Sequence, residues 1–227
     1  MPNHHEDYRK QITYFYWENG LNPEMEQMEK LAHYATLLVA KNESVNLISR
    51  KDISSVIENH IFLSSFITKY IPDKCHRFVD IGTGGGLPGI PVAIMKPELK
   101  GVLVDSIGKK IDAVKGFIEK IMINNVTAET ARVESPEFIA KYKGKFDLII
   151  SRATVPLIVL IRYAFPLIAE KGVLLSLKGG DLTKEFQKAE ISYKSFIKKS
   201  TTFELHYKPS NIRNSKEKKL ILLEIVK

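Results

Sequence analysis

The most constraining feature of this chain is a glycine-rich stretch at residues 78–90, which reads Phe-Val-Asp-Ile-Gly-Thr-Gly-Gly-Gly-Leu-Pro-Gly-Ile. A short apolar run leads into four glycines within five positions, and the apolar residues and prolines that follow suit the first turn of a helix. The pattern predicts a strand, a tight turn and a helix. Because glycine reaches positive φ and lets the backbone approach a ligand, we expect a binding cleft here. The free N–H groups of the following helix should face it.

Two cofactor classes fit this turn. Gly84, Gly86 and Gly89 match the dinucleotide pattern G-x-G-x-x-G. Asp105 follows at about the spacing of ~20 residues expected for an acid that binds ribose. Read from Gly82 instead, the stretch resembles the first motif of S-adenosylmethionine-dependent methyltransferases. That resemblance implies a loop packed around the methionine part of the cofactor, and an acid, here Asp105, that accepts both ribose hydroxyls.

Strand and helix signals alternate from residue 77 onward, which predicts a doubly wound α/β sheet. The predicted strands are residues 78–81, 102–105, 126–131, 146–151, 172–177, 202–207 and 220–226. The predicted helices between them are residues 88–95, 107–122, 135–142, 156–169 and 181–196. Seven strands fit the class I S-adenosylmethionine-dependent methyltransferase fold, a Rossmann-like sheet whose last strand is antiparallel. They leave no room for the second domain of a dehydrogenase.

The chain is predicted to have two parts, an N-terminal helical segment at residues 1–72 packed on the core and a Rossmann-like methyltransferase domain at residues 73–227. Apolar residues at helical spacing predict three helices in the segment, and Asp52 is expected to cap the third. His60 lies in that third helix beside apolar neighbours, so we expect it to be structurally bonded.

The amino-acid composition indicates which class of partner the chain could bind and in which cellular compartment it works. The 227 residues carry 34 Lys plus Arg against 26 Asp plus Glu, and the net charge of +8 favours a polyanionic partner. The sequence shows no apolar run of ~18 residues and no signal-peptide pattern. Cys75 is the single cysteine, and no His, Cys or carboxylate grouping has metal-ligand spacing. We therefore expect a cytoplasmic protein that has no membrane span, no internal disulfide and no bound metal. We expect it to be a monomer.

Ligands in open α/β sheets lie beyond the carboxyl ends of the strands. This rule places Asp105 and Ser106 at the end of the second strand and Val133 with Glu134 near the adenine. Arg152, at the end of the fourth strand, would face the transferred methyl group. Two plainer interpretations stay open, in which Glu134 only caps a helix and Arg152 is only a surface cation.

The residues at the end of the fourth strand also limit which atom of a base the chain could methylate. Enzymes that methylate exocyclic amino groups of bases commonly carry an Asn/Asp-Pro-Pro-aromatic turn there, and this chain has Ser-Arg-Ala-Thr at residues 151–154. Enzymes that act at a pyrimidine carbon need a cysteine nucleophile, and Cys75 precedes the first strand. A ring nitrogen such as guanine N7 has a free lone pair and no proton to lose, so its methylation needs no general base.

Several motifs together resemble those of the RsmG/GidB family of bacterial 16S ribosomal RNA guanine-N7 methyltransferases. They are Asp80-Ile81-Gly82-Thr83-Gly84-Gly85-Gly86-Leu87-Pro88-Gly89-Ile90-Pro91, Asp105-Ser106, Lys109-Lys110, Arg132-Val133-Glu134, Ser151-Arg152-Ala153 and Leu177-Lys178-Gly179. The similarity covers residues from about 45 to about 180, and the Leu-Pro-Gly-Ile-Pro run is its most selective part. The resemblance implies S-adenosyl-L-methionine as cofactor and 16S rRNA or the small ribosomal subunit as partner. It also implies methylation of a guanosine in the 530 loop, at position 527 of that RNA.

The predicted cofactor-binding residues are Asp80, Gly82, Gly84, Gly86, Leu87, Asp105, Ser106, Val133, Glu134 and Arg152. Arg152 is also the predicted catalytic residue. Two other functions stay open: a methyltransferase of the same fold that acts on a protein or a small molecule, and an RNA-binding factor without turnover.

Overall fold

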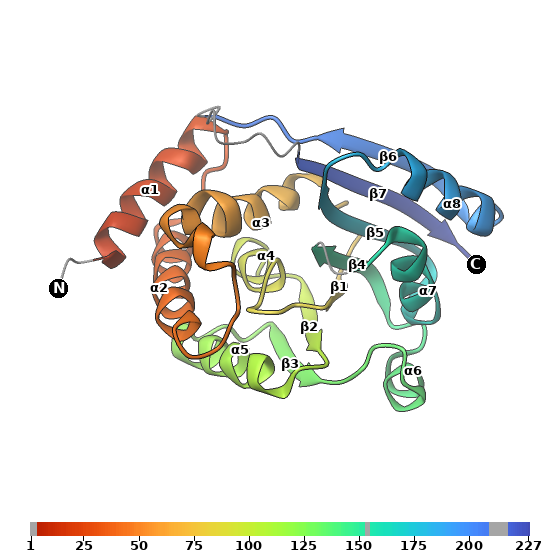
Figure 1. The fold of residues 1–227 in the computed structure, drawn as a ribbon, viewed down its shortest axis with the longest axis horizontal. Helices are drawn as coiled ribbons and strands as arrows, with labels where there is room; N and C mark the ends of the chain where they lie inside the picture. Colours follow the sequence, from red (N-terminus) through yellow and green to blue (C-terminus); the bar gives the residue numbers. More distant parts are fainter. Residues whose placement is uncertain (1–3, 153–154, 209–217) are drawn as a thin grey trace.

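The centre of the computed structural model is a seven-stranded sheet in the order β3-β2-β1-β4-β5-β7-β6 (Figure 1). Its strands are β1 (Arg77–Ile81), β2 (Lys100–Asp105), β3 (Val126–Thr130), β4 (Phe146–Arg152), β5 (Ile168–Gly179), β6 (Ile197–Glu204) and β7 (Lys218–Val226). The strands from β1 to β5 pair in parallel, whereas β7 is antiparallel to both β5 and β6. This confirms the predicted antiparallel last strand. The structure describes residues 4–152, 155–208 and 218–227.

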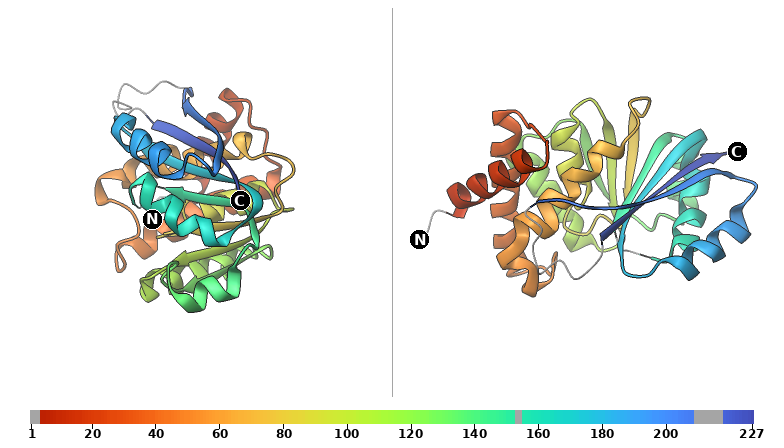
Figure 2. Two further views of the ribbon diagram at one scale, coloured as in Figure 1. Left: turned by 90° about the vertical axis from the view of Figure 1, so that its right-hand side faces the viewer. Right: turned by 90° about the horizontal axis from the view of Figure 1, so that it is seen from above.

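Helices cover both faces of the sheet (Figure 2). The helices α4 (Gly89–Met95) and α5 (Gly108–Ile121) belong to one layer, and α6 (Pro136–Tyr142), α7 (Leu157–Leu167) and α8 (Thr183–Tyr193) belong to the other. Successive strand residues point to opposite faces, so Phe78 joins one buried cluster and Val79 joins the other. Right-handed crossovers explain the layers, because the chain moves outward from β1 in one direction and then returns to build β4 and β5.

The N-terminal segment covers part of one face that lacks a crossover helix. It contains α1 (His4–Glu18), α2 (Met25–Asn42), the 3₁₀ turn η1 (Arg50–Ser55), the π-helical turn η2 (Ile57–Phe62), α3 (Leu63–Phe66) and the 3₁₀ turn η3 (Ile67–Tyr70). Ile57, Ile61 and Phe62 share one buried cluster with Leu148 of β4 and Leu175 of β5. The core is therefore continuous across the predicted boundary at residue 72, and the division into two parts stays a prediction.

The predicted third helix is present, but Asp52 is not its cap. The chain is helical throughout residues 50–70, and its hydrogen bonding changes from 3₁₀ in η1 to π in η2, α in α3 and 3₁₀ in η3. The oxygen that caps the first turn is Ser49 Oγ, which accepts a hydrogen bond of 3.3 Å from Lys51 N. The π-helical turn η2 carries His60, and such turns often occur at functional sites.

The sixth strand is also shifted relative to its predicted residues, 202–207. The strand ends at Glu204, because the chain then leaves the sheet to pack on the N-terminal segment. The ring of Tyr207 lies 5.3 Å from that of Phe62, and its hydroxyl lies 3.2 Å from Glu58 Oε1. Burial of this aromatic side chain outweighs continuation of the edge strand.

Candidate active site

A cavity of about 340 Å³ opens at the carboxyl edge of the sheet. Pockets of roughly 300–1,000 Å³ suit small ligands and cofactors. Five predicted site residues line this cavity: Gly82, Asp105, Ser106, Val133 and Glu134. The other lining residues are Ile81, Val104, Ala131, Arg132, Val155 and Tyr163.

Asp105 joins the cavity wall to the glycine loop. Its Oδ2 accepts a hydrogen bond of 3.0 Å from Gly84 N, and its Oδ1 accepts one of 3.0 Å from Ile107 N. A carboxylate has about four lone-pair sites, so two backbone bonds leave capacity for the hydroxyls of a ligand. The half-buried carboxylate is therefore oriented before any ligand arrives.

The glycine loop has the backbone conformation that its sequence predicts. Gly82, Gly84 and Gly86 all have positive φ, at 72°, 57° and 99°. A Cβ on Gly84 would meet no atom within 4 Å, whereas one on Gly86 would lie 2.5 Å from Ile90 Cδ1. Gly84 thus leaves open space, while Gly86 allows close packing inside the protein.

Asp80 lies behind the loop and does not line the cavity. Its fully buried carboxylate accepts hydrogen bonds from Thr83 Oγ1, at 2.6 Å, and from Gly89 N, at 2.8 Å, through Oδ2. Burial raises the pKa of Asp80 to about 7. The prediction of free N–H groups at the start of α4 is corrected here, because Asp80 binds the Gly89 amide and Gly86 O accepts from Ile90 N. The N-terminal end of α4 therefore does not face the cavity.

The far wall comes from the loop after β3. Ser135 is the N-cap of α6, and its Oγ accepts a 3.3 Å hydrogen bond from Phe138 N. Glu134 is therefore not the cap residue, and its exposed carboxylate lines the cavity beside the buried Val133. Tyr163 of α7 completes this side and was missed by sequence reasoning. In the sequence, Tyr163 is only one polar-tipped side chain within a mostly apolar helix, which is a weak signal for a binding site. The structure shows that it is half-buried.

Arg152 occupies a different position from the cavity residues. It ends β4, and its guanidinium reaches the N-terminal segment, where Nη2 lies 2.8 Å from His60 Nδ1 and Nη1 lies 3.5 Å from Ser64 Oγ. Burial, then the charges of Arg152 and Lys218, lower the pKa of His60 to about 3. The imidazole is therefore neutral, and its Nδ1 accepts the hydrogen bond that Arg152 donates. Residues 153 and 154, part of the predicted strand-end motif, lie outside the described residues.

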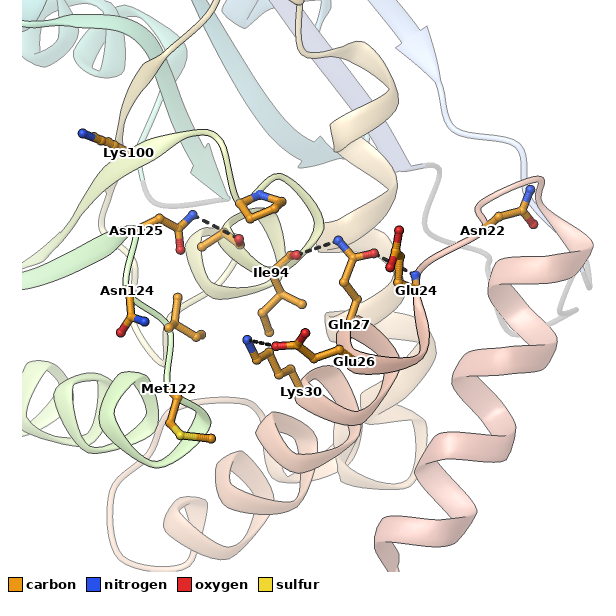
Figure 3. Close-up of a pocket in the computed structure, with 13 residues that line it drawn as sticks. Asn22, Glu24, Glu26, Gln27, Lys30, Ile94, Lys100, Met122, Asn124 and Asn125 are labelled. Carbon is orange, nitrogen blue, oxygen red and sulfur yellow. Dashed lines mark hydrogen bonds and ion pairs between the residues drawn. The ribbon is translucent and has the colours of Figure 1, made fainter.

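A larger cavity, of about 740 Å³, lies at the opposite edge of the sheet (Figure 3). Two of its polar side chains bond to the backbone of α4. Gln27 Nε2 donates to Ile94 O at 2.9 Å, and Asn125 Nδ2 donates to Ala93 O at 3.1 Å (Figure 3). Among the described residues, no buried side-chain atom without a partner lines it. We therefore assign these groups to holding α2 and α4 together, and the ligand site to the smaller cavity.

No group of three His, Cys, Asp or Glu side chains is arranged to hold a metal ion within residues 4–152, 155–208 and 218–227. In the same residues, no helix has both the length and the apolar character needed to cross a membrane.

Comparison with known proteins decides the family. The model of the GidB family, described as rRNA small subunit methyltransferase G, matches residues 27–214. A ribosomal RNA small subunit methyltransferase G from Chlorobium luteolum is 40% identical over 190 residues, which are 83% of this chain and 78% of that protein. One from Acinetobacter baylyi is 39% identical, with 76% of this chain and 81% of that protein covered. This chain belongs to the rRNA small subunit methyltransferase G family.

The residues that match the family model include every predicted site residue. Membership confirms the resemblance drawn from the sequence and makes the chain a methyltransferase of the small-subunit rRNA class. Solved structures confirm the fold. An O-methyltransferase from Bacillus cereus in complex with SAH superposes with a TM-score of 0.63 at 14% identity, covering 98% of this chain and all of that one. An rRNA methylase from Streptococcus thermophilus gives 0.54 at 14% identity, with 75% and 99% covered.

The cavity also fits the cofactor of this fold. Three of its lining residues, Gly82 with positive φ, Asp105 held by two backbone amides and the apolar Val133, suit a nucleoside joined to an amino-acid chain. Gly84 does not line the cavity and acts on it through its hydrogen bond to Asp105.

Proposed function

We propose that this chain transfers the methyl group of S-adenosylmethionine to N7 of a guanosine in the 530 loop of 16S rRNA, in the cytoplasm. Family membership supports the substrate class. The choice of N7 rests on one observation: the Nδ1 lone pair of His60, which could otherwise act as a base, is already engaged by Arg152. A reaction that needs no base suits this arrangement.

Guanine N7 is such an acceptor. Its lone pair is exposed and it has no proton to lose, so alignment with the methyl donor supplies most of the acceleration. In an RNA helix this edge lies in a deep, narrow groove, so the guanine must be in a loop or out of the stack. A loop target in rRNA meets that requirement.

The cofactor residues have distinct roles in this proposal. S-adenosylmethionine supplies a methyl group activated on a positively charged sulfur. Asp105 accepts hydrogen bonds from the ribose hydroxyls with the lone pairs that Gly84 and Ile107 leave free. Ser106 lies beside it, and Val133 with Glu134 borders the adenine end.

The residues behind the loop act indirectly. Asp80, Gly86 and Leu87 do not line the cavity and are buried, so we propose that they shape the glycine loop. Gly82 does line the cavity and is proposed to contact the ligand. Arg152 is proposed to orient the reacting guanine by donating to O6, which leaves the N7 lone pair free to attack the methyl group.

The test supplies the full chain with methyl-labelled S-adenosylmethionine and three acceptors: protein-free 16S rRNA, isolated small subunits and bulk soluble protein. We expect label in RNA. Borohydride reduction and aniline cleavage, followed by primer extension, should give one stop in the 530 loop. Label in protein, or in RNA at a position that resists this cleavage, would contradict the N7 assignment.

A further inference from the structure

The N-terminal segment contacts the glycine loop directly. Tyr34 of α2 is fully buried, and its hydroxyl donates a 2.8 Å hydrogen bond to Gly85 O. Burial raises the pKa of Tyr34 well above its ordinary value, so this hydroxyl stays a donor. The glycine loop is therefore tied to a helix that is not part of the sheet or its crossovers.

Packing reinforces this tie. A Cβ on Gly85 would lie 3.0 Å from Leu38 Cδ1 and 3.0 Å from Leu47 Cβ, so both side chains lie close against the loop. Asn42, the last residue of α2, holds the next stretch in place, because its Oδ1 accepts hydrogen bonds from Leu47 N at 2.8 Å and Ile48 N at 2.9 Å. The position of the loop thus depends on α2 and the residues after it.

A second contact reaches Arg152. His60 projects from the π-helical turn η2, and its neutral Nδ1 accepts the 2.8 Å hydrogen bond from Arg152 Nη2. On the other side of the ring, Nε2 lies 3.5 Å from Asp52 Oδ2 but is buried without a hydrogen-bond partner. The hydrogen bond from Arg152 to Nδ1 therefore joins η2 to the end of β4.

We propose that the N-terminal segment positions both halves of the reaction centre, with Tyr34 as the positioning residue for the glycine loop and His60 as the positioning residue for Arg152. The His60 half rests on the proposed role of Arg152, whereas the Tyr34 half rests only on cofactor binding. Neither side chain touches the reacting atoms in this proposal. Each holds a group that does.

Tyr34→Phe tests the first half, because it removes one hydroxyl and keeps the buried ring. Tyr16→Phe is the matched control: Tyr16 is also buried in the segment, and its hydroxyl bonds to Ser65 Oγ at 2.5 Å, away from the loop. We expect both variants to lower Tm. The dissociation constant for S-adenosylmethionine, measured by calorimetry, should rise about five- to tenfold in Tyr34→Phe only, the equivalent of one hydrogen bond.

The control decides between positioning and general stability. Equal dissociation constants in Tyr34→Phe and the wild type would overturn the role of Tyr34. Equal weakening in Tyr34→Phe and Tyr16→Phe would reduce that role to general stability. This measurement needs no methyl acceptor, so it stands even where the proposed rRNA target fails.

His60 is tested by a set of substitutions. The side-chain oxygen of Asn can take the place of Nδ1, that of Gln falls nearer Nε2, and Leu has no acceptor. We expect kcat in His60→Leu to fall by up to about a hundredfold, the typical cost of ~1 Å of misplacement. His60→Asn should recover most of that loss, and the dissociation constant for S-adenosylmethionine should change less than about twofold.

Comparing kcat among the His60 variants and Arg152→Ala distinguishes a positioning role of His60 from a failure of the role proposed for Arg152. Equal kcat in His60→Asn and His60→Leu would overturn positioning through Nδ1, and where the Leu variant fails to fold, His60→Gln takes its place in the comparison. Unchanged activity of Arg152→Ala would instead remove the proposed role of Arg152, which is a separate failure. Kinetics are read on whichever acceptor the wild-type chain methylates.

Discussion

The two sides of the site are built in different ways. Asp105 bonds to Gly84 and Ile107, which lie 21 and 2 positions away in the sequence, and all three belong to the sheet and its connections. Arg152 bonds to His60 and Ser64, which lie 92 and 88 positions away in the N-terminal segment. The groups that bond directly to Asp105, on the proposed ribose side, therefore belong to the sheet and its connections, and Tyr34 of α2 supports the same glycine loop at Gly85. The groups that bond to Arg152, on the proposed methyl-transfer side, belong to the N-terminal segment.

The largest effect should come from Arg152→Ala. Loss of this side chain should lower kcat by about a hundredfold or more while S-adenosylmethionine still binds, because Arg152 does not line the proposed cofactor cavity. Arg77→Ala is the matched control, an exposed arginine at the opposite end of the neighbouring strand β1. Methylation kinetics and calorimetry on both variants check this, and loss of cofactor binding in Arg152→Ala would break the comparison between the two sides.

Asp105→Asn should weaken cofactor binding on the proposed ribose side of the site. The amide nitrogen cannot accept from a backbone N–H, so the variant loses the bond to Gly84 or the bond to Ile107 and has fewer acceptor sites for the ligand. We expect the dissociation constant for S-adenosylmethionine to rise about 10- to 100-fold, the range for hydrogen bonds to a charged group. Calorimetry measures it, with the exposed Asp112→Asn on α5 as control. A change confined to kcat would contradict the ribose assignment.

Gly86→Ala tests how much stability the chain loses when a Cβ is added inside the glycine loop. The new Cβ would lie 2.5 Å from Ile90 Cδ1 at a φ of +99°, so the free energy of unfolding should fall by about 1–3 kcal/mol. Gly116→Ala, in the middle of α5 with no atom within 4 Å of the new Cβ, should instead add about 0.5–1 kcal/mol. Urea unfolding of both variants tests this, and equal shifts would show that the loop tolerates a Cβ.

The smallest effect concerns pH. Burial lowers the pKa of His60 to about 3 in the folded chain, whereas an unfolded histidine titrates near about 6.5. Between these values the unfolded state binds a proton that the folded state does not. The free energy of unfolding therefore falls as pH drops below about 6.5, by at most about 1.4 kcal/mol per pH unit.

His60→Asn removes this contribution. Urea unfolding at pH 7 and pH 5 should show a smaller loss of stability on acidification for the variant than for the wild type. The exposed His206→Asn is the matched control and should keep the wild-type difference. Equal pH dependence of His60→Asn and the wild type would mean that His60 is as easily protonated folded as unfolded, and would contradict its burial against Arg152.

Much of the cofactor side was predictable because its signals are local. A strand that runs into glycines, and an acid at the end of the next strand, are read from a few adjacent residues. The structure gathers Gly82, Asp105, Ser106, Val133 and Glu134 around one cavity, as parallel strand ends require. The family was also recognisable from these motifs, and the match over residues 27–214 confirms it.

The contacts of the N-terminal segment were not predictable in the same way. Tyr34 and His60 look like members of apolar helix stripes, and such a stripe shows that a face is buried but not what covers it. Their partners lie 51 and 92 positions away. The third helix also takes up π-helical hydrogen bonding over Ile57–Phe62, where His60 meets Arg152, and its apolar periodicity did not predict this.

By itself, therefore, the sequence determined the sheet, the glycine loop and the acid at the end of β2, since each follows from short-range backbone preference and strand order. Only the tertiary structure decided that Asp80 lies behind the loop and that Arg152 bonds to His60. The physical reason is that β4 and β5 have no crossover helix on one face. Burying that face brings the N-terminal segment, with His60, to Arg152 at the proposed reaction centre.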